Sequence, residues 1–195
     1  MSTATRITVE QYMAMADRGD FDPPHHRVEL IRGEIVAKDT GSDAGPSNAP
    51  HNGTVIAMTM WCAKIVPDRV DLSVGRNVDI AELDSMPEPD ITWLAARDYT
   101  LALPTAADIL LAIEVSDSSL RRDRRVKAPL YAEAGIRDYW IVNVPGRCVE
   151  VFRDPVGGVY REMTTFKAGQ DVPVLRFPEI VLPVGRIFPA TTNEG

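Results

Sequence analysis

Residues 110–119 read LLAIEVSDSS, an apolar run interrupted by a glutamate, Glu114. A segment that is apolar on both faces is typical of a central strand covered on both sides. Side chains of a strand alternate between its faces, so we expect one face to carry Leu111, Ile113 and Val115, and the other Leu110, Ala112, Glu114 and Ser116. An ionised carboxylate buried there costs several kcal/mol unless another group compensates it.

Three compensations are open to Glu114. It could accept an ion pair from a nearby arginine, it could be protonated, or it could share a divalent cation with a second carboxylate. For the third option, Asp90 at the start of the segment DITWL is the best-placed partner, because that segment reads as a neighbouring strand. Two carboxylates with a backbone carbonyl and waters commonly hold Mg²⁺.

Upstream of this strand, periodicity predicts a short helix, a hairpin, a loop, a helix and a further strand. Thr8 and Gln11 have the spacing of a capping box, and VELIRGEIV (28–36) reads as a hairpin about Arg32 and Gly33. The polar stretch 41–50 predicts a mobile loop. Next come a helix over about 51–65, with its apolar face on Val55, Thr59, Cys62 and Val66, and a strand from Leu72 through Val74 and Val78 to Ile80.

Downstream, VKAPLYAEAGI predicts a helix that ends at Gly135. Pro129 is tolerated only in a first turn, so this helix either begins near Arg125 or Val126 or is kinked there. A buried strand, YWIVNV, and a hairpin that turns at Gly157 and Gly158 follow. We expect core packing for the large aromatic residues Trp61, Trp93, Tyr139 and Trp140.

These elements predict an α/β (α+β) fold, a mixed sheet with helices packed against it. The 195 residues suit one domain. We expect a core over about 51–144, with 1–40 and 145–195 as peripheral extensions.

Composition indicates the compartment of the protein and the class of its partners. The chain has neither a signal peptide nor an apolar run long enough to span a membrane, so we expect a cytoplasmic protein without a membrane partner. Cys62 and Cys148 are then expected to be reduced. The net charge of −7 argues against a wholly basic nucleic-acid surface, yet a local basic cluster is present. Its members are Arg121, Arg122, Arg124, Arg125 and Lys127, interrupted by Asp123.

The ordered combination of these segments resembles a known family. PDITW (89–93), then LLAIEVSDSSLRRDRRVKAPLYAEAGIRDYWIVN (110–143), is similar to the signature of the Uma-type restriction endonuclease family, a branch of the PD-(D/E)XK nuclease superfamily. VELIRGEIV (28–36) and HNG (51–53) also match the family pattern. The similarity covers nearly the whole chain.

This resemblance implies a restriction-endonuclease-like core of helix, three strands, helix and strand. Asp90 takes the PD position and Glu114 the (D/E) position, and both would hold Mg²⁺ or Mn²⁺. The superfamily lysine normally lies two residues after that acid, where this chain has Ser116. The family resembles a variant whose lysine has moved to the following helix, which assigns the role to Lys127. Asp123 lies four residues earlier, on the same face of a regular helix.

The implied activity is metal-assisted hydrolysis of a nucleic-acid phosphodiester, with DNA as the expected substrate. Lys127 would orient the attacking water or stabilise charge on the phosphate. Glu29 is a candidate for a further carboxylate, although a hairpin surface charge is an equally good interpretation. Phosphate contacts would come from the arginines, Arg121, Arg122, Arg124 and Arg125. Cleavage of both strands needs two active sites, so we expect a homodimer.

Two alternatives stand beside this hypothesis. The chain could retain the nuclease fold as a nucleic-acid-binding or assembly module without turnover, which Ser116 and the acidic net charge favour. A transition-metal hydrolase built on His25, His26 and Glu29 is a poorer fit, because adjacent histidines lack the spacing of helical zinc sites. His51 opens the predicted helix, and its spacing suggests no role in catalysis.

Overall fold

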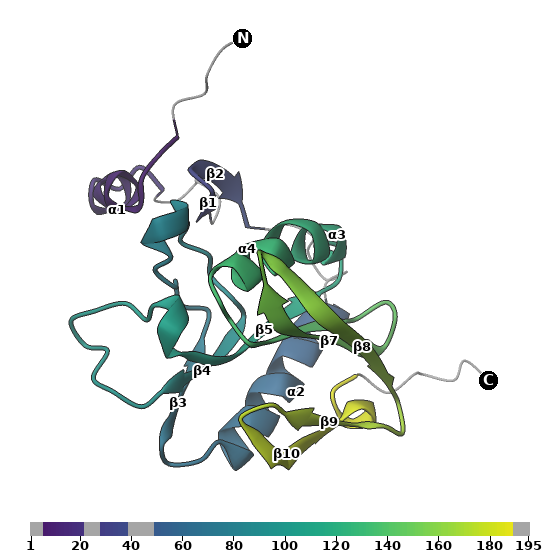
Figure 1. Ribbon diagram of the computed structural model, residues 1–195. Coiled ribbons are helices and arrows are strands. Elements are labelled where there is room, and N and C mark those ends of the chain that lie inside the picture. Colours follow the sequence, from purple (N-terminus) through teal and green to yellow (C-terminus); the bar gives the residue numbers. More distant parts are fainter. Residues whose placement is uncertain (1–5, 22–27, 39–48, 189–195) are drawn as a thin grey trace.

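A mixed six-stranded sheet forms the centre of the protein (Figure 1). The computed structural model describes residues 6–21, 28–38 and 49–188. The sheet has the strand order β3-β4-β5-β6-β7-β8, and only the β5–β6 pair is parallel. Its strands are β3 (Val70–Val74), β4 (Ile91–Ala95), β5 (Ile109–Ser116), β6 (Asp138–Asn143), β7 (Cys148–Val156) and β8 (Val159–Lys167). The predicted mixed sheet is confirmed.

Helices cover both faces of this sheet, in the predicted core order. Helix α2 (Ala49–Ile65) precedes β3, β4 and β5, and a helical segment joins β5 to β6. One apolar cluster packs α2 against the sheet together with a hairpin of β9 (Asp171–Val174) and β10 (Phe177–Pro183). A second cluster packs the helical segment against the opposite face, with Ile31 of the N-terminal hairpin. The aromatic residues expected in the core are buried or packed against it: Trp61, Trp93, Tyr139 and Trp140.

The buried face of α2 differs from the predicted one. Its fully buried residues are Thr54, Met58 and Cys62, so of the predicted set only Cys62 is among them. The helix is apolar around much of its circumference, which leaves Ile56 and Met60 exposed. Periodicity alone therefore could not select the face. Both cysteines are free and buried, as expected.

The segment that joins β5 to β6 is one helical stretch with a widened turn. It comprises α3 (Leu120–Arg122), the π-helical turn η4 (Asp123–Lys127) and α4 (Ala128–Glu133). In η4 the N–H of Ala128 donates to the carbonyl of Asp123, five residues earlier. This widened turn directly precedes Pro129, whose ring would clash with a regular helix at that point. The helix thus begins at Leu120, before the predicted start near Arg125 or Val126, and the widened turn lies where the second alternative expected a kink.

The helix ends as predicted at a glycine. Gly135 has φ +80°, a conformation that favours residues without a Cβ atom. Its N–H donates to the carbonyl of Ala132, and the N–H of Ile136 donates to that of Tyr131. This pair of bonds is a Schellman motif, which satisfies carbonyls left free at the helix end.

Two strand predictions need correction. The strand predicted from Leu72 to Ile80 ends at Val74, because the backbone turns at Gly75 with φ +57°. Val78 and Ile80 are still buried, in the cluster beneath the helical segment. The prediction that Leu110 lies on the same strand face as Glu114 was also wrong.

A bulge between β4 and β5 explains the position of Leu110. Trp93 pairs with Leu111 but Leu94 pairs with Ile109, so Leu110 is the inserted residue. Leu110 therefore packs with the α2 cluster instead of sharing the face of Glu114. The register beyond the bulge is regular, with Ile91 opposite Ile113.

The remaining elements are peripheral to the sheet. Helix α1 (Val9–Asp17) has the predicted capping box of Thr8 and Gln11. The predicted N-terminal hairpin consists of β1 (Val28–Ile31) and β2 (Glu34–Ala37). Within the six-stranded sheet itself, the predicted β7–β8 hairpin turns at Gly157 and Gly158. Short 3-10 helices are η2 (Ala81–Leu83), η3 (Ala106–Asp108) and η5 (Val184–Arg186). Most of the predicted loop, 41–48, lies outside the described residues.

Candidate active site

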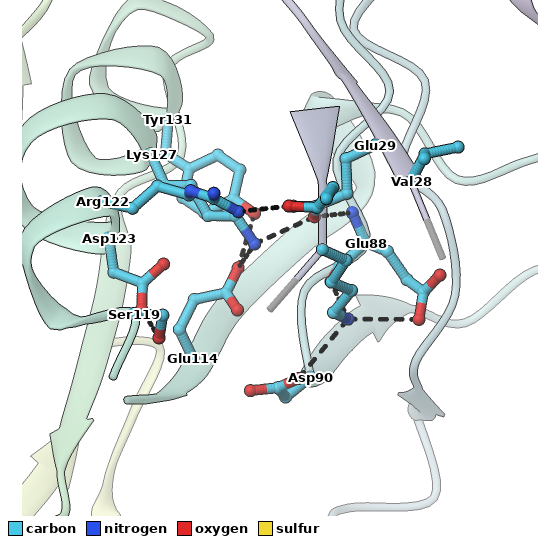
Figure 2. Close-up of polar contacts among 12 residues, drawn as sticks. Val28, Glu29, Glu88, Asp90, Glu114, Ser119, Arg122, Asp123, Lys127 and Tyr131 are labelled. Carbon is cyan, nitrogen blue, oxygen red and sulfur yellow. Dashed lines mark hydrogen bonds and ion pairs between the residues drawn. The ribbon is translucent and has the colours of Figure 1, made fainter. Parts of the chain in front are cut away.

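Asp90 and Glu114 lie on adjacent antiparallel strands and on the same face of the sheet (Figure 2). Asp90 directly precedes β4, and Glu114 is the sixth residue of β5. The backbone N–H of Val115 donates to Oδ2 of Asp90 at 2.8 Å, which ties the two strands together at this point. The strand register therefore brings together two carboxylates that are 24 residues apart in the chain.

Glu114 is buried and is held from the helical segment. Its Oε1 accepts hydrogen bonds from Nζ of Lys127 at 2.8 Å and from the hydroxyl of Tyr131 at 3.0 Å. Burial raises the pKa of Glu114 to about 8, and the ammonium of Lys127 only partly offsets this effect. Oε2 of Glu114 accepts no hydrogen bond from any described residue. The carboxylate thus retains an oxygen for another ligand.

Glu29 joins the same cluster from β1. Its Oε1 lies 2.9 Å from Nζ of Lys127 and accepts the backbone N–H of Glu88 at 2.7 Å. The side chain is 1% exposed, and no described residue donates to its buried Oε2. Glu29 is therefore no surface charge of the hairpin, because it lies inside the protein against Lys127.

Lys127 is the centre of this cluster. Burial lowers its pKa, but Glu114, Glu29 and Asp123 together outweigh burial and raise the pKa well above the usual value for lysine. Lys127 is consequently a buried ammonium ion. An ammonium has three N–H donors, one of which donates to Glu114, while Glu29 is a second ion-pair partner.

Asp123 is buried next to this cluster, on the first residue of η4. Its Oδ2 accepts hydrogen bonds from the hydroxyls of Ser116 and Ser119, each at 2.6 Å. Burial raises the pKa of Asp123, while Lys127 and the two hydroxyls lower it. Ser116, at the position of the usual superfamily lysine, therefore binds the helical segment instead of contributing a charge.

Two neighbours of the site, Lys38 and Glu88, could not be recognised from the sequence, and a third, Tyr131, was missed. Nζ of Lys38, which follows β2, donates to the carbonyl and to Oε1 of Glu88 at 2.6 and 3.1 Å. The same atom lies 3.5 Å from Oδ1 of Asp90. Only the packing of the N-terminal hairpin against the sheet brings Lys38 here, and no local motif signals it. Tyr131 could have been suggested by its position four residues after Lys127.

His51 also lies against the site. Its Nε2 is 2.9 Å from the carbonyl of Val115, the residue that follows Glu114. A proton on Nε2 makes His51 a donor to this carbonyl. The other two histidines, His25 and His26, lie outside the described residues, so the zinc alternative stays a prediction.

The four arginines of the basic cluster have different environments. Arg121 and Arg125 are exposed. Arg122 lines the small cavity of the site and donates to the carbonyl of Ala37 at 2.5 Å. Arg124 binds the buried carboxylate of Glu150 through two nitrogens, at 2.7 and 2.5 Å. The cluster is therefore divided between solvent, the site and an ion pair.

The donor atoms of the site suit a hard divalent cation. Negative groups outnumber positive ones around a cavity of about 20 Å³, which has room for about one water. The carboxylates are Glu29, Asp90, Glu114 and Asp123, and the cations are Lys38, Lys127 and Arg122. Carboxylate oxygens are the ligands that Mg²⁺ and Mn²⁺ prefer. The described residues nevertheless contain no set of three histidine, cysteine or acidic side chains preformed around one point.

Two larger hollows lie elsewhere on the surface. One, of about 470 Å³, is lined by residues 71–73 and 97–100 among others, and the second, of about 390 Å³, by residues 79–83 and 105–107 among others. Both are lined without Asp90, Glu114 or Lys127. We therefore locate the chemistry by its buried charges, because the size of a hollow does not indicate reactive groups.

Comparisons with known proteins agree with the fold. A solved structure from Anabaena variabilis ATCC 29413, described as "a putative nuclease belonging to DUF820", is similar over 93% of this chain and 97% of its own. The identity is 17% and the TM-score 0.68, which shows a shared fold. A search of curated proteins found no match. None of the described helices is long and apolar enough to cross a membrane.

A family model described as "Putative restriction endonuclease" matches residues 9–185. This match covers both carboxylates of the site, the helical segment with Lys127, and the N-terminal hairpin with Glu29. The resemblance found in the sequence is thereby confirmed. The chain belongs to the Uma2 family.

Proposed function

We propose that this protein is a metal-dependent endonuclease that hydrolyses phosphodiester bonds of DNA. The observation that carries the proposal is the convergence of Asp90 and Glu114 from adjacent strands, with Lys127 bound to Glu114 at 2.8 Å. Two carboxylates and one ammonium in a small polar cavity provide what phosphodiester hydrolysis requires: cation binding and stabilisation of a phosphate.

Asp90 and Glu114 would hold the ion, Mg²⁺ or Mn²⁺, through the oxygens that the protein leaves available. Oδ2 of Asp90 is fixed by the N–H of Val115, and Oε1 of Glu114 is fixed by Lys127 and Tyr131. Oε2 of Glu114 and Oδ1 of Asp90, which has Lys38 at 3.5 Å, are then the oxygens that would bind the ion. Oε2 of Glu29, buried without a donor among the described residues, supports a role as a further carboxylate. A bound divalent ion lowers the pKa of a coordinated water and offsets charge on the phosphate.

The reaction adds water across a phosphorus–oxygen ester bond. The water oxygen bonds to phosphorus, the ester oxygen leaves, and a proton from the water neutralises that leaving oxygen. Lys127 is held in place by Glu114 and Glu29, so a remaining N–H can be directed at the attacking water or at a phosphate oxygen without further reorganisation. Asp123, bound to Ser116 and Ser119, fixes the start of the helical turn that carries Lys127.

Contacts with the nucleic-acid backbone would come from the arginines that remain exposed. Arg121 and Arg125 precede and follow the start of η4, close in sequence to Lys127. Arg124 is a weaker candidate than the sequence suggested, because Glu150 already binds its guanidinium. Cleavage of both strands would use a homodimer, and we place the whole activity on the single domain predicted for residues 1–195.

The second candidate function is a nucleic-acid-binding or assembly module without turnover. Its support is that Lys127 and Tyr131 already bind Glu114, and that Ser116 replaces the usual lysine. Such a protein would bind DNA equally well with and without Mg²⁺.

A cleavage assay distinguishes the two functions. Plasmid DNA and single-stranded RNA are incubated with the full chain in Mg²⁺, in Mn²⁺ and in EDTA, beside Glu114→Gln and the surface control Glu162→Gln. We expect DNA cleavage with either metal, none in EDTA, a loss of at least about 100-fold in Glu114→Gln, and full activity in the control. Equal DNA binding in all conditions without cleavage of either nucleic acid would overturn the proposal.

A further inference from the structure

A second ammonium group lies at the candidate site, and it comes from the N-terminal hairpin. Lys38 follows β2, and its side chain is 8% exposed. Nζ donates to the carbonyl and to Oε1 of Glu88, and lies 3.5 Å from Oδ1 of Asp90. No role for Lys38 follows from the sequence pattern or from the resemblance described above.

The contacts of Lys38 and Lys127 differ in a way that distinguishes their roles. Lys127 is 3% exposed, and two carboxylates bind it at 2.8 and 2.9 Å. The contact of Lys38 with Asp90, at 3.5 Å, is an ion pair without a hydrogen bond. The ammonium of Lys38 can therefore leave Asp90 while Glu88 still holds it at the edge of the site. Lys127 has no such freedom.

The oxygen that Lys38 faces is the one that Asp90 would offer to a cation. Oδ2 of Asp90 accepts the N–H of Val115, whereas Oδ1 has Lys38 as its charged neighbour among the described residues. An ammonium this close to Oδ1 repels a divalent ion approaching the same oxygen. Lys38 thus supplies the positive charge of the metal-free site and competes with metal for Asp90.

We propose that Lys38 is a further catalytic residue. When a divalent ion binds, the ammonium of Lys38 leaves Asp90 and contacts a phosphate oxygen of the substrate. This inference rests on the nuclease function proposed above. After the exchange, Lys38 and Lys127 contact the phosphate from opposite sides of the carboxylate pair, one from the hairpin and one from the helical segment. Lysine suits this role because its ammonium is carried on a flexible stem.

The test combines metal binding with cleavage on the full chain. Calorimetric titration with Mn²⁺ alone compares wild type with Lys38→Met, Lys38→Arg and the exposed control Lys64→Met. We expect Lys38→Met to bind Mn²⁺ at least about tenfold more tightly, since the competing charge is gone. Lys38→Arg and Lys64→Met should bind like wild type. Single-turnover cleavage should then fall at least about 100-fold in Lys38→Met, in spite of the tighter metal binding.

Opposite changes in affinity and rate would not arise from a structural role. Circular dichroism establishes that each variant is folded, and Lys38→Gln replaces Lys38→Met if the latter is not. Unchanged or weaker Mn²⁺ binding in a folded variant overturns the exchange with metal, and unchanged cleavage overturns the contact with phosphate. In both cases the nuclease proposal stands if wild type binds Mn²⁺ through Glu114 and cleaves DNA. The nuclease proposal itself fails if the wild-type protein neither binds Mn²⁺ nor cleaves DNA.

Discussion

Nζ of Lys127 lies 2.8 Å from Oε1 of Glu114, although 13 residues separate the two in the chain. The ammonium also binds Glu29 at 2.9 Å, so one buried cation joins β1, β5 and the helical segment. Removal of Lys127 would leave two buried carboxylates without their counter-ion. The interaction is therefore structural as well as chemical.

We expect Lys127→Met to lower the free energy of unfolding by about 3 kcal/mol, because breaking a buried ion pair leaves an uncompensated charge. Urea denaturation of metal-free protein at about pH 9, where Glu114 with its pKa of about 8 is ionised, measures this loss. The double variant Lys127→Met, Glu114→Gln should recover part of it, since one of the two orphaned charges is also removed. A loss below about 1 kcal/mol would show that the buried pair is dispensable.

The pH dependence of stability tests the environment of Glu114. Burial raises its pKa from 4.5 to about 8, so the folded chain holds this proton more tightly than the unfolded chain. The contribution of Glu114 to stability is then greatest below the unfolded value and is lost as the pH rises through the folded one. Glu114→Gln is always neutral and lacks this loss.

We therefore expect the melting temperature of Glu114→Gln, relative to wild type, to rise between about pH 5 and about pH 8.5 in EDTA. Each kcal/mol corresponds to roughly 2–4 °C for a chain of this length. Glu162→Gln on the exposed strand β8 serves as control, with no pH-dependent difference expected. A constant gap between Glu114→Gln and wild type would contradict the raised pKa.

The hydroxyls that bind Asp123 provide a third prediction. Ser116→Ala removes one of two hydrogen bonds to a buried carboxylate, and we expect a loss of about 2 kcal/mol in unfolding free energy. Ser119→Ala should cost a similar amount, and the double variant should cost more than the sum, because Asp123 then has neither donor. Thermal unfolding of the three variants checks this. If each single variant lost less than about 1 kcal/mol of unfolding free energy and the double variant lost only the sum, water would replace both hydroxyls.

The basic cluster yields a fourth prediction, which separates arginines that bind DNA from those that hold the fold. The double variant Arg121→Ala, Arg125→Ala should leave the free energy of unfolding unchanged. The slope of log binding constant against log salt concentration should fall by the amount expected for about two phosphate contacts. Arg124→Ala should instead lower stability by about 1–2 kcal/mol, a value reduced for the partial exposure of Arg124, because buried Glu150 loses its guanidinium partner.

Fluorescence anisotropy over a range of salt concentrations measures the DNA affinities, with the exposed residue Arg161→Ala as control. An equal loss of affinity in the double variant and in Arg161→Ala would show that no particular arginines carry the phosphate contacts.

Strand-level features of this protein could be predicted from its sequence. The alternation of β5 and the strand predicted to start at Asp90, which in fact begins at Ile91, indicated a pair of neighbouring carboxylates, because strand pairing follows from short, regular patterns. Family resemblance, and not periodicity, assigned Lys127. The face of α2 and the position of Leu110 were predicted wrongly: one helix is apolar around much of its circumference, and one bulge shifts a register by a single residue.

Features that depend on packing between distant segments were not predictable. Lys38 reaches the site only because the β1–β2 hairpin packs beside the sheet, more than 50 residues from Asp90 in the chain. Glu29 lies on the same hairpin, and only the family resemblance made it a candidate. Nothing local distinguishes Lys38 from a surface lysine. The π-helical turn could not be predicted either. Pro129 indicated that the helix is irregular there, but not that the irregularity is a widened turn.

The central claim is that Glu114 is a metal ligand, and a calorimetric Mn²⁺ titration tests it most directly. Wild type, Glu114→Ala and Glu162→Ala are compared, each first shown to be folded by circular dichroism. We expect wild type and Glu162→Ala to bind Mn²⁺ alike, and Glu114→Ala to lose at least about 100-fold in affinity. Equal binding by all three proteins, or binding by none, would contradict the claim and leave Glu114 as a structural charge paired with Lys127.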